Sequence, residues 1–600
     1  MSYNSLQACV KDLEENGHLL RIKEEVDPDL EMAAIHRQVF DAGGPAILFE
    51  KVKGSPFPAL SNLYGTYERT EFLFRDTIAN AKKVMELKAD PSSFLRQPGR
   101  YFSAPTSAVS ALPVKSRLGA PILYGETTID RLPQIKSWPM DGGAFITLPQ
   151  VFTLPPGSKQ IMKSNLGMYR IQLSGNAYAQ NKEVGLHYQL HRGIGVHHTA
   201  YNNSDEPFRA SIFVGGPPSH AFAAIMPLPE GLSELTFAGL LGGRRFRYLW
   251  KDGYVLSADA DFVITGTIRK QELKPEGPFG DHLGYYSLTH EFPVMDVEKV
   301  YYRKDAIWHF TVVGRPPQED SSFGYLIHKL VEPLTAGEFP GIVEVNAVDA
   351  AGVHPLLLAI GSERYMPFRE RKPEEILTQA NHLLGKGQTS LAKFLIIAAH
   401  GDDTSLNTHD IPQFFQHVLR RVDWRRDLHF QTKTTIDTLD YSGSDWNAGS
   451  KVVIACCGAP IRTLTAQLPE DFSLPEGFSD PHFVMPGILA IKGPTFQSES
   501  EVQQLALHLD RFELGSIPLI VLTNDSQFLA SHLNNFLWTT FTRANPSHDI
   551  HGIRGFVEHK HWGCEGSLII DARAKPHHAP ELVEDEAASK RAEELLGRYL

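Results

Sequence analysis

The stretch KPEGPFGDHLGYYS, Lys274 to Ser287, places two carboxylates in a segment rich in proline and glycine. Glu276 and Asp281 flank the sequence GPFG, and two tyrosines follow before the chain returns to an apolar run. Proline restricts the backbone and glycine permits tight turns, so this segment is expected to hold its acids rigidly. General acid catalysis needs rigid acid placement, whereas an exposed acidic turn is the alternative interpretation.

The sequence on either side of this stretch predicts a mixed α/β (α+β) protein. From about 115 to 315, short apolar runs such as ASIFVGG and DFVITGTIR are separated by Gly, Pro and Asn, which indicates a β-barrel core with α/β decoration. The flanking regions alternate helix and strand patterns. We therefore expect an N-terminal α/β segment at 1–110, the barrel-like core at 111–320, and a C-terminal α/β domain at 321–600 that ends in a charged helix.

The C-terminal region contains two similar segments that resemble an internal repeat. FLIIAAHGDD is followed by a predicted helix and RRVDWRRDLHF, and PLIVLTNDSQ is followed by a predicted helix and FTRANPSHDIHG. In both copies an arginine precedes an aspartate by six residues, Arg421 before Asp427 and Arg543 before Asp549. Two related strand–helix units in one sheet would explain this similarity, and chance likeness of common α/β units is the alternative.

Composition narrows the class of protein. The 600 residues predict two to four domains, and the net charge of −12 argues against a nucleic-acid-binding role. The four cysteines show no CxxC spacing, so neither a disulfide framework nor a cysteine zinc site is indicated. No run of 18 apolar residues is present, and we expect a cytoplasmic protein without a transmembrane span.

Several motifs are ambiguous when taken alone. GKGQTS lacks the spacing of a phosphate-binding P-loop and predicts an ordinary loop. Lys451 follows a Gly-Ser turn and could bind a phosphate, although a solvated lysine is the better interpretation from spacing. The histidines of HRGIGVHH more often belong to a surface or a core than to a metal site.

Residues of NLGMYR could complete a site with the two acids. Asn165 offers an oxygen ligand suited to a hard cation, and Arg170 a fixed fork of donors suited to a carboxylate. Two acids near one arginine can differ in role: one stays ionised against the arginine, and the other holds a raised pKa and donates a proton.

Taken together, these motifs resemble the UbiD family of reversible decarboxylases, which use prenylated FMN. The resemblance covers roughly residues 5 to 455 and rests on five segments in the family's order: NLGMYR, HRG at 191–193, LSELTFAGLL at 232–241, PEGPFGDHLGYY, and GRPP at 314–317. Beyond 455 the chain is similar to longer members, some of them assigned to menaquinone biosynthesis.

The resemblance implies roles for individual residues. Arg170, Glu276 and Asp281 would form the catalytic network, with Asp281 as proton donor and Glu276 orienting Arg170. The metal ligands, for Mn²⁺ or Mg²⁺, would be Asn165, His191 and Glu234, with K⁺ often nearby. The cofactor would be lined by Met168, Tyr169, Arg170, His187, Tyr188, Gln189, Arg192 and Gly193, with Lys451 at its phosphate.

The family resemblance also implies the architecture and the reaction. We expect a cofactor domain built on an FMN-binding split β-barrel and a C-terminal domain that mediates dimers or hexamers. The expected reaction is loss of CO₂ from an aromatic or α,β-unsaturated acid, because a cofactor must accept the electrons that no side chain can hold. A flavin prenyltransferase would supply that cofactor.

The sequence leaves the substrate open. A dihydroxynaphthoate of menaquinone synthesis, a polyprenyl-hydroxybenzoate of ubiquinone synthesis, and a small phenolic or heteroaromatic acid all fit, and peripheral membrane contact stays open for a lipid-tailed acid. Two other classes are also retained. One is a hydrolase that uses Glu276 and Asp281 as an acid/base pair, and the other is a non-catalytic assembly protein.

Overall fold

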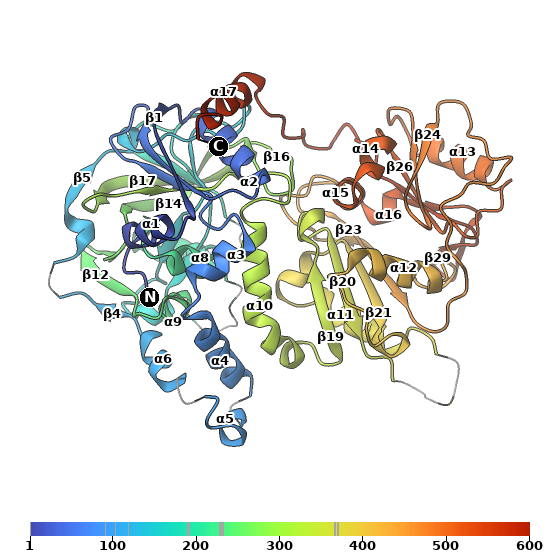
Figure 1. Cartoon of the computed structure of the whole chain (residues 1–600), viewed down its shortest axis with the longest axis horizontal. Coiled ribbons are helices and arrows are strands. Elements are labelled where there is room, and N and C mark those ends of the chain that lie inside the picture. The colour runs from blue at the N-terminus through green and yellow to red at the C-terminus, as the bar shows by residue number, and fades with distance from the viewer. Residues whose placement is uncertain are drawn as a thin grey trace. The chain divides into compact units, whose positions relative to one another are not determined.

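The computed structural model describes residues 2–599 except 91, 102–103, 118, 189–192, 227, 229–232, 365–367 and 369–370. The chain forms two compact units (Figure 1): unit 1 is Met1–Leu334 with Glu581–Leu600, and unit 2 is Thr335–Pro580. The mixed helix-and-strand class predicted from the sequence is confirmed. Among the described residues, no helix combines the length and apolarity that crossing a membrane requires.

The units divide the chain differently from the domains expected from the sequence. The boundary near 334 lies within α10 (Ser321–Glu338) rather than near 320. The terminal helix α17 (Glu586–Leu596) belongs to unit 1, beside α2 (Glu31–Asp41) in Figure 1. It lies there because Ala588, Ala592 and Leu595 are buried in the hydrophobic core that α2 also joins.

A nine-stranded sheet forms the frame of unit 1. Its longest strands, β14 (Phe262–Glu276) and β17 (His290–Tyr302), pair antiparallel, with Glu276 opposite His290. The acidic stretch is therefore the connection of a long hairpin, and β15 (Phe279–Gly280) pairs with β16 (Tyr286–Ser287) inside it. The other strands of the sheet are β5 (Gly125–Thr127), β6 (Phe145–Ile146), β7 (Gln150–Thr153), β8 (Asn165–Gly167), β9 (Ile171–Gln172), β10 (Glu183–Leu186) and β11 (Phe208–Val214).

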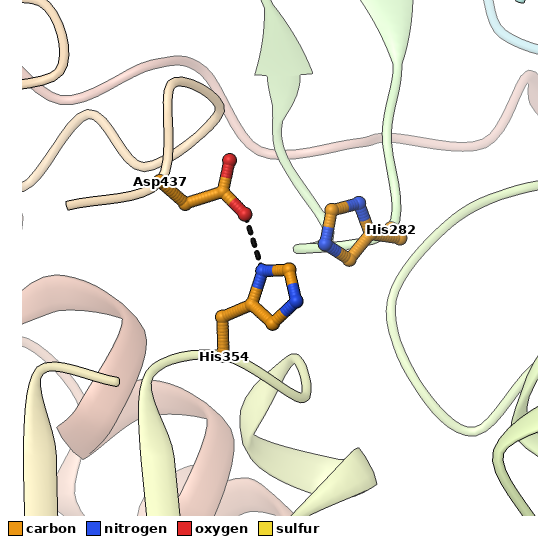
Figure 2. A group of neighbouring side chains, drawn as sticks. All are labelled: His282, His354 and Asp437. Atoms are coloured by element: carbon orange, nitrogen blue, oxygen red, sulfur yellow. Dashed lines mark hydrogen bonds and ion pairs between the residues drawn. The ribbon is translucent and has the colours of Figure 1, made fainter. Parts of the chain in front are cut away.

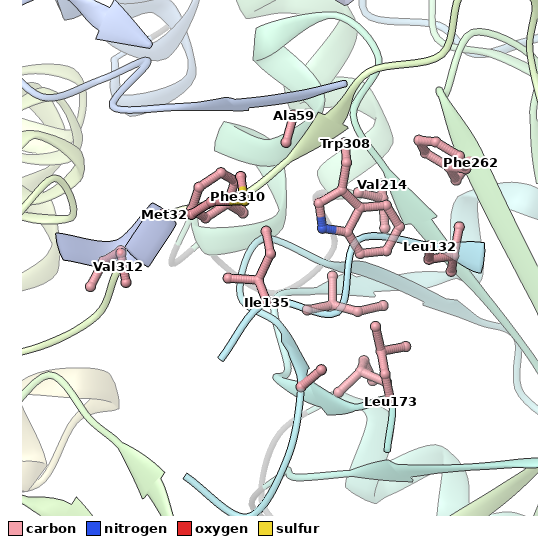
Figure 3. Packing of buried hydrophobic residues seen from close by; sticks show 14 of the residues in the cluster. Met32, Ala59, Leu132, Ile135, Leu173, Val214, Phe262, Trp308, Phe310 and Val312 are labelled. Carbon is pink, nitrogen blue, oxygen red and sulfur yellow. The ribbon is translucent and has the colours of Figure 1, made fainter. Parts of the chain in front are cut away.

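The core of unit 1 fixes this frame (Figure 3). Trp308 is fully buried, and its ring lies edge-on to Phe262 of β14, with 5.2 Å between ring centroids. Trp308 begins β18 (Trp308–His309), which belongs to a separate four-stranded sheet with β1 (Leu19–Val26), β2 (Ala46–Val52) and β3 (Ala59–Ser61). Aromatic burial of this kind dominates core energetics, so this cluster stabilises the start of β14.

Unit 2 contains the internal repeat that the sequence suggested, but in two sheets rather than one. The first sheet has the order β19-β20-β21-β23-β22 and the second β24-β25-β26-β30-β27. In each, three central strands run parallel and both edge strands run antiparallel. The strands are β19 (Ile342–Ala347), β20 (Leu356–Gly361), β21 (Phe394–Ala399), β22 (Leu428–Thr434), β23 (Gly449–Cys456), β24 (Ser479–Met485), β25 (Ile488–Lys492), β26 (Leu519–Thr523), β27 (Ile550–Gly552) and β30 (Leu568–Asp571).

The arginine of each repeated arginine–aspartate pair is the last residue of a helix. Helix α12 (Ile411–Arg421) ends at one arginine and α15 (Leu533–Arg543) at the other. The Asp427 carboxylate accepts a hydrogen bond from the backbone N–H of Asp423 at 2.9 Å, and the Asp549 carboxylate accepts one from Asn545 at 2.7 Å. The two turns share the same geometry, which favours a true duplication over chance likeness.

Within unit 2, the two copies contact each other where the helix of one copy ends and the strand of the other begins. Trp424, which follows α12, donates a hydrogen bond from Nε1 to the carbonyl of Pro518, which precedes β26, at 2.9 Å. Reciprocally, Lys393, which precedes β21, donates to the carbonyl of Ala544, which follows α15, at 3.0 Å. Such reciprocal contacts have the form of a two-fold symmetric interface.

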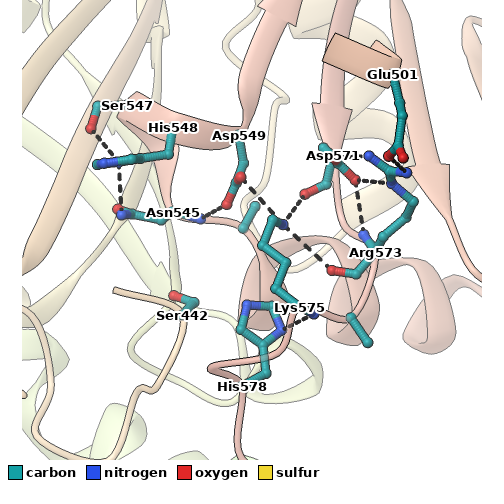
Figure 4. Close-up of polar contacts among 12 residues, drawn as sticks. Ser442, Glu501, Asn545, Ser547, His548, Asp549, Asp571, Arg573, Lys575 and His578 are labelled. Atoms are coloured by element: carbon teal, nitrogen blue, oxygen red, sulfur yellow. Dashed lines mark hydrogen bonds and ion pairs between the residues drawn. The ribbon is translucent and has the colours of Figure 1, made fainter. Parts of the chain in front are cut away.

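Buried charges stabilise the second copy (Figure 4). Lys575 lies 3.2 Å from the Asp549 carboxylate, and Arg573 forms a buried ion pair with Asp571 at 2.7 Å. Breaking one partner of a buried pair leaves an uncompensated charge, so the stretch from Asp571 to Lys575 is firmly held.

Candidate active site

Arg170 joins the two acids of the β14–β17 hairpin. It lies between β8 and β9, and its Nε and Nη2 donate to the two carboxylate oxygens of Glu276 at 2.8 and 2.7 Å. Its Nη1 donates to Asp281 Oδ2 at 2.5 Å, and Nη2 also reaches Ser287 Oγ at 3.0 Å. The structure therefore brings together the three residues predicted to form the catalytic network.

Glu276 is the ionised partner of Arg170. It ends β14 and is fully buried. Burial alone would raise its pKa, but the charge and hydrogen bonds of Arg170 and a hydrogen bond from His187 outweigh burial and lower the pKa to about 2. His187 Nδ1 lies 3.1 Å from Glu276 Oε2, and its ring stacks on Phe292. His187 thus contacts the network rather than standing apart from it.

Asp281 is held by the turn around it. Its Oδ1 accepts hydrogen bonds from the backbone N–H of His282 at 2.8 Å and from His282 Nδ1 at 2.9 Å. Burial acts to raise the pKa of Asp281, but His282 and Arg170 together lower it. The expectation of a raised pKa on one acid is therefore wrong for this state, because both carboxylates share the cation of Arg170.

Two of the predicted metal ligands lie side by side. Asn165 begins β8, and Glu234 begins α9 (Glu234–Gly242) behind the cap residue Ser233. The backbone N–H of Leu166 donates to Glu234 Oε2 at 3.3 Å, which places this carboxylate next to Asn165. Burial raises the pKa of Glu234, and no basic side chain among the described residues pairs with it. A half-buried carboxylate beside an amide oxygen is a donor set that fits a hard divalent cation.

Gly193 lies too close to Asn165 to carry a side chain. A Cβ on Gly193 would lie 2.2 Å from Asn165 Oδ1, so a side chain at this position would displace the amide. Asn165 Oδ1 accepts a hydrogen bond from Tyr169 at 3.2 Å, and Asn165 Nδ2 is buried with no hydrogen-bond partner among the described residues. The amide oxygen of Asn165, which here accepts from Tyr169, is the atom that fits the predicted cation site. The third predicted ligand, His191, lies outside the described residues, as do Gln189 and Arg192.

The remaining predicted cofactor residues have varied surroundings. Met168 donates its backbone N–H to the Ala224 carbonyl at 2.9 Å and packs against the core. Tyr188 is buried, and its hydroxyl lies 2.6 Å from Nδ1 of His198, whose Nε2 contacts the Lys270 carbonyl. His198 is thus a satisfied core histidine, in agreement with the structural interpretation of the HRGIGVHH cluster.

Lys451 belongs to unit 2. It lies on β23, where its Nζ donates to the backbone carbonyl of Ser390 and burial lowers its pKa. Its role at a cofactor phosphate stays a prediction. Elsewhere in unit 2, His354 Nδ1 is hydrogen-bonded to the Asp437 carboxylate (Figure 2).

Sequence reasoning missed three residues that shape this site. His282 and Ser287 lie inside the quoted stretch, but nothing in their spacing indicated contacts with Asp281 and Arg170. Asp141 is distant in sequence, yet its Oδ1 accepts the backbone N–H of Gly280 at 2.7 Å. Burial raises the pKa of Asp141 to about 6, and the sequence offers no signal that it supports this turn.

The chain matches three protein-family models that together span most of its length. Residues 10–88 match the UbiD N-terminal domain, 117–316 the Rift-related domain, and 321–456 the C-terminal domain of 3-octaprenyl-4-hydroxybenzoate carboxy-lyase. The second copy of the repeat in unit 2 lies beyond the last of these matches.

Relatives and solved structures agree with these matches. A protein of Chlamydia trachomatis is 37% identical over 593 residues, 97% of each chain. A Chlamydia pneumoniae protein described as one of the subunits of 4-hydroxybenzoate decarboxylase is 34% identical, over 97% of this chain and 96% of its own. Vanillic acid decarboxylase of Sedimentibacter hydroxybenzoicus, in closed form, shares the fold with a TM-score of 0.64 and 21% identity, over 80% of this chain and 97% of that one. An evolved dimeric form of the UbiD-class enzyme HmfF from Pelotomaculum thermopropionicum, in complex with prFMN, has a TM-score of 0.57 and 20% identity, over 76% of this chain and 94% of that one.

Proposed function

The chain belongs to the UbiD family of carboxy-lyases, and from this premise we propose that it releases CO₂ non-oxidatively from an aromatic or α,β-unsaturated carboxylic acid with the help of prenylated FMN. The observation that carries the proposal is the buried network of Arg170, Glu276 and Asp281. One guanidinium bound to two carboxylates offers both a binding group for a third carboxylate and a nearby proton carrier.

The chemistry requires an electron sink. Loss of CO₂ leaves an electron pair on carbon, and prenylated FMN, when bound, would accept it. Residues proposed to hold this cofactor are those of the NLGMYR segment, Met168, Tyr169 and Arg170, those that follow β10, His187, Tyr188, Gln189, Arg192 and Gly193, and Lys451 at the phosphate. Asn165, Glu234 and His191 would hold the divalent cation, and the fit of Asn165 and Glu234 supports this part of the proposal.

In the proposed mechanism, Arg170 first exchanges one partner. Glu276 accepts hydrogen bonds from Nε and Nη2, and Asp281 accepts one from Nη1. Nη1 is therefore the donor that would leave Asp281 and bind the substrate carboxylate. Asp281 thereby loses its cationic partner, so its pKa rises toward the value that burial favours. The lowered pKa in the free enzyme is therefore compatible with a later role as proton donor.

As its pKa rises, Asp281 takes up a proton from solvent, and it then supplies that proton to the substrate carbon in place of CO₂. His282 holds the other carboxylate oxygen, so the acid keeps one orientation while Arg170 moves from it. Departure of CO₂ removes the substrate charge from Arg170, which becomes available to Asp281 again once the proton has been transferred. The hairpin thus fixes the order of the proton and charge movements.

The substrate is proposed by class. The name of the Chlamydia pneumoniae relative favours a phenolic acid of the 4-hydroxybenzoate type, whether small or polyprenylated. A dihydroxynaphthoate of quinone synthesis stays a second candidate within the same reaction. We further propose a homo-oligomer and a flavin prenyltransferase as cofactor supplier.

The test is to co-express the chain with a flavin prenyltransferase and record its mass and visible absorption spectra. We expect bound prenylated FMN and CO₂ release from at least one acid in a panel of phenolic, prenylated phenolic, naphthoic and heteroaromatic acids. Asp281→Asn, which keeps the size and loses the proton, should bind cofactor but release no CO₂. A protein that stays free of flavin under these conditions contradicts the proposal and favours the hydrolase or assembly alternative.

A further inference from the structure

The end of the chain pairs with the turn that carries Asp281. The backbone N–H of Leu582 donates to the Gly284 carbonyl at 3.2 Å, and Glu581 forms an antiparallel bridge with Tyr285. Both partners belong to unit 1. A segment from the far end of the sequence, 581–584, here called the tail, therefore adds a strand-like edge to the β14–β17 hairpin.

The residues that meet the tail also hold Asp281. The backbone N–H of Asp281 donates to the Tyr285 carbonyl at 3.0 Å, and the N–H of Gly284 donates to the Asp281 carbonyl at 3.0 Å. The backbone of Gly284 and Tyr285 thus forms hydrogen bonds with Asp281 and also pairs with the tail. Only one layer of backbone separates the tail from the proposed proton donor.

A second link runs through side chains. Glu584 lies 3.3 Å from Nε of Arg37, which is buried and stacks over the ring of Trp138 at 4.3 Å. Trp138 in turn lies so close to Gly280, the residue before Asp281, that a Cβ on Gly280 would meet it at 2.0 Å. The tail therefore supports the turn from both of its ends.

Helix α17, which follows the tail, is anchored to unit 1 by contacts that do not involve the Asp281 turn. Helix α17 buries Ala588 and Ala592 in the core of unit 1, and Gln38 donates to the Ser589 carbonyl at 2.8 Å. A hollow of about 680 Å³ separates part of the tail from Met140 and Tyr286. The tail thus contacts the turn mainly through the paired backbone, Leu582 and Glu584, rather than through continuous packing.

We propose that residues Glu581–Glu584, the C-terminal clasp, are positioning residues for Asp281. The clasp fixes the backbone of Gly284 and Tyr285, and with it the direction in which the Asp281 carboxylate points when Arg170 releases it. This inference rests on the proposed decarboxylase function for its effect on rate, but its effect on the turn itself is independent of that function. A purely structural role, closing a sheet edge, is the alternative.

Leu582→Pro tests the clasp most directly, because proline removes the backbone donor to Gly284. Leu582→Ala is the matched variant, since it shortens the same side chain and keeps the N–H. For the side-chain link, Glu584→Gln removes the charge that faces Arg37, and Glu594→Gln changes an exposed carboxylate of α17 as its control. All variants use the full chain.

The first readout is hydrogen–deuterium exchange of residues 279–287 in the protein without cofactor. We expect faster exchange in Leu582→Pro than in Leu582→Ala, at similar melting temperatures, and intermediate exchange in Glu584→Gln. The second readout is CO₂ release by the cofactor-loaded enzyme. Because small misplacements of a reacting group are costly, kcat of the proline variant should fall at least about tenfold below that of the alanine variant, with KM changed less.

The outcomes separate the two proposals. Equal exchange in the proline and alanine variants overturns the clasp, whatever the activity. Faster exchange with equal kcat in the two variants also overturns it, since the pairing would then be structural only. Faster exchange together with no CO₂ release from any acid, even by the unmodified enzyme, leaves the clasp's hold on the turn in place and contradicts the proposed function instead.

Discussion

Asp281 Oδ2 lies 2.5 Å from Arg170 Nη1, so the proposed proton donor and the proposed carboxylate-binding group neutralise each other before substrate arrives. Glu276 accepts two further hydrogen bonds from the same guanidinium, through Nε and Nη2. These bonds would hold Arg170 in position when a substrate carboxylate replaces Asp281 at Nη1. A substrate carboxylate must compete with Asp281 for one donor, and that competition sets when the acid can take up a proton.

Arg170→Lys should nearly abolish activity while the fold persists. Lysine keeps the charge but lacks the planar fork that binds two carboxylates and leaves a third direction free. We expect kcat/KM to fall by about a hundredfold in CO₂-release assays. Arg269→Lys is the control, because Arg269 also binds several carboxylates but lies outside the network. Equal losses in the two variants would show that the fork at Arg170 has no special role.

Glu276 should make stability depend on pH in one direction. Its pKa is lowered from 4.5 to about 2 in the folded state, so it stabilises the fold fully above the unfolded pKa. This contribution is lost as pH falls from about 4.5 toward 2. Glu276→Gln should therefore cost about 3 kcal/mol of unfolding free energy at pH 7 and less at pH 4. Denaturant unfolding at both pH values checks this, and an equal cost at both would contradict it.

Gly193→Ala should empty the proposed cation site without unfolding the chain. The added methyl would lie 2.2 Å from Asn165 Oδ1 and push that ligand aside. We expect the affinity for Mn²⁺ to fall at least about tenfold, with loss of bound flavin. Metal analysis and the visible spectrum measure both. Gly324→Ala, where a methyl meets nothing within 4 Å, is the control, and retention of metal by the Gly193 variant would place the cation elsewhere.

His282→Ala should move the titration of Asp281 upward. The imidazole of His282 helps to lower the pKa of Asp281, and its removal leaves burial less opposed. The apparent pKa that Asp281 contributes to the pH profile of kcat/KM should therefore rise, while the backbone hydrogen bond from residue 282 remains. His559→Ala, at a histidine that is almost fully exposed, is the control. A profile identical to that of the unmodified enzyme would remove His282 from the network.

The sequence predicted which side chains come together around Arg170 better than it predicted their pKa values. Arg170, Glu276 and Asp281 come together as their residue types suggested, since a guanidinium fork suits carboxylates. The pKa of Asp281 could not be predicted, because it depends on which side chains share Arg170 and on the turn at His282. Asp141 was missed for the same reason: only the fold brings it to Gly280.

The same limit applies to the architecture. Periodicity predicted the helices and strands of the internal repeat. Whether the repeats share one sheet depends on long-range strand pairing, which local patterns do not specify. The place of α17 in unit 1 likewise follows from tertiary burial rather than from its charged sequence.

Because the two sheets of unit 2 belong to one chain, the two copies of the repeat can change in sequence independently. Covalent linkage makes their association intramolecular, so it does not depend on protein concentration, unlike that of two separate chains. In a symmetric pair of identical chains every substitution appears twice, whereas here each copy changes alone. Lys451 stands three residues before Ile454, which pairs with Leu428, and the equivalent place before Ile570, which pairs with Ile550, is Ser567. One copy can therefore carry the lysine proposed to bind phosphate, while the other copy has a serine at that place.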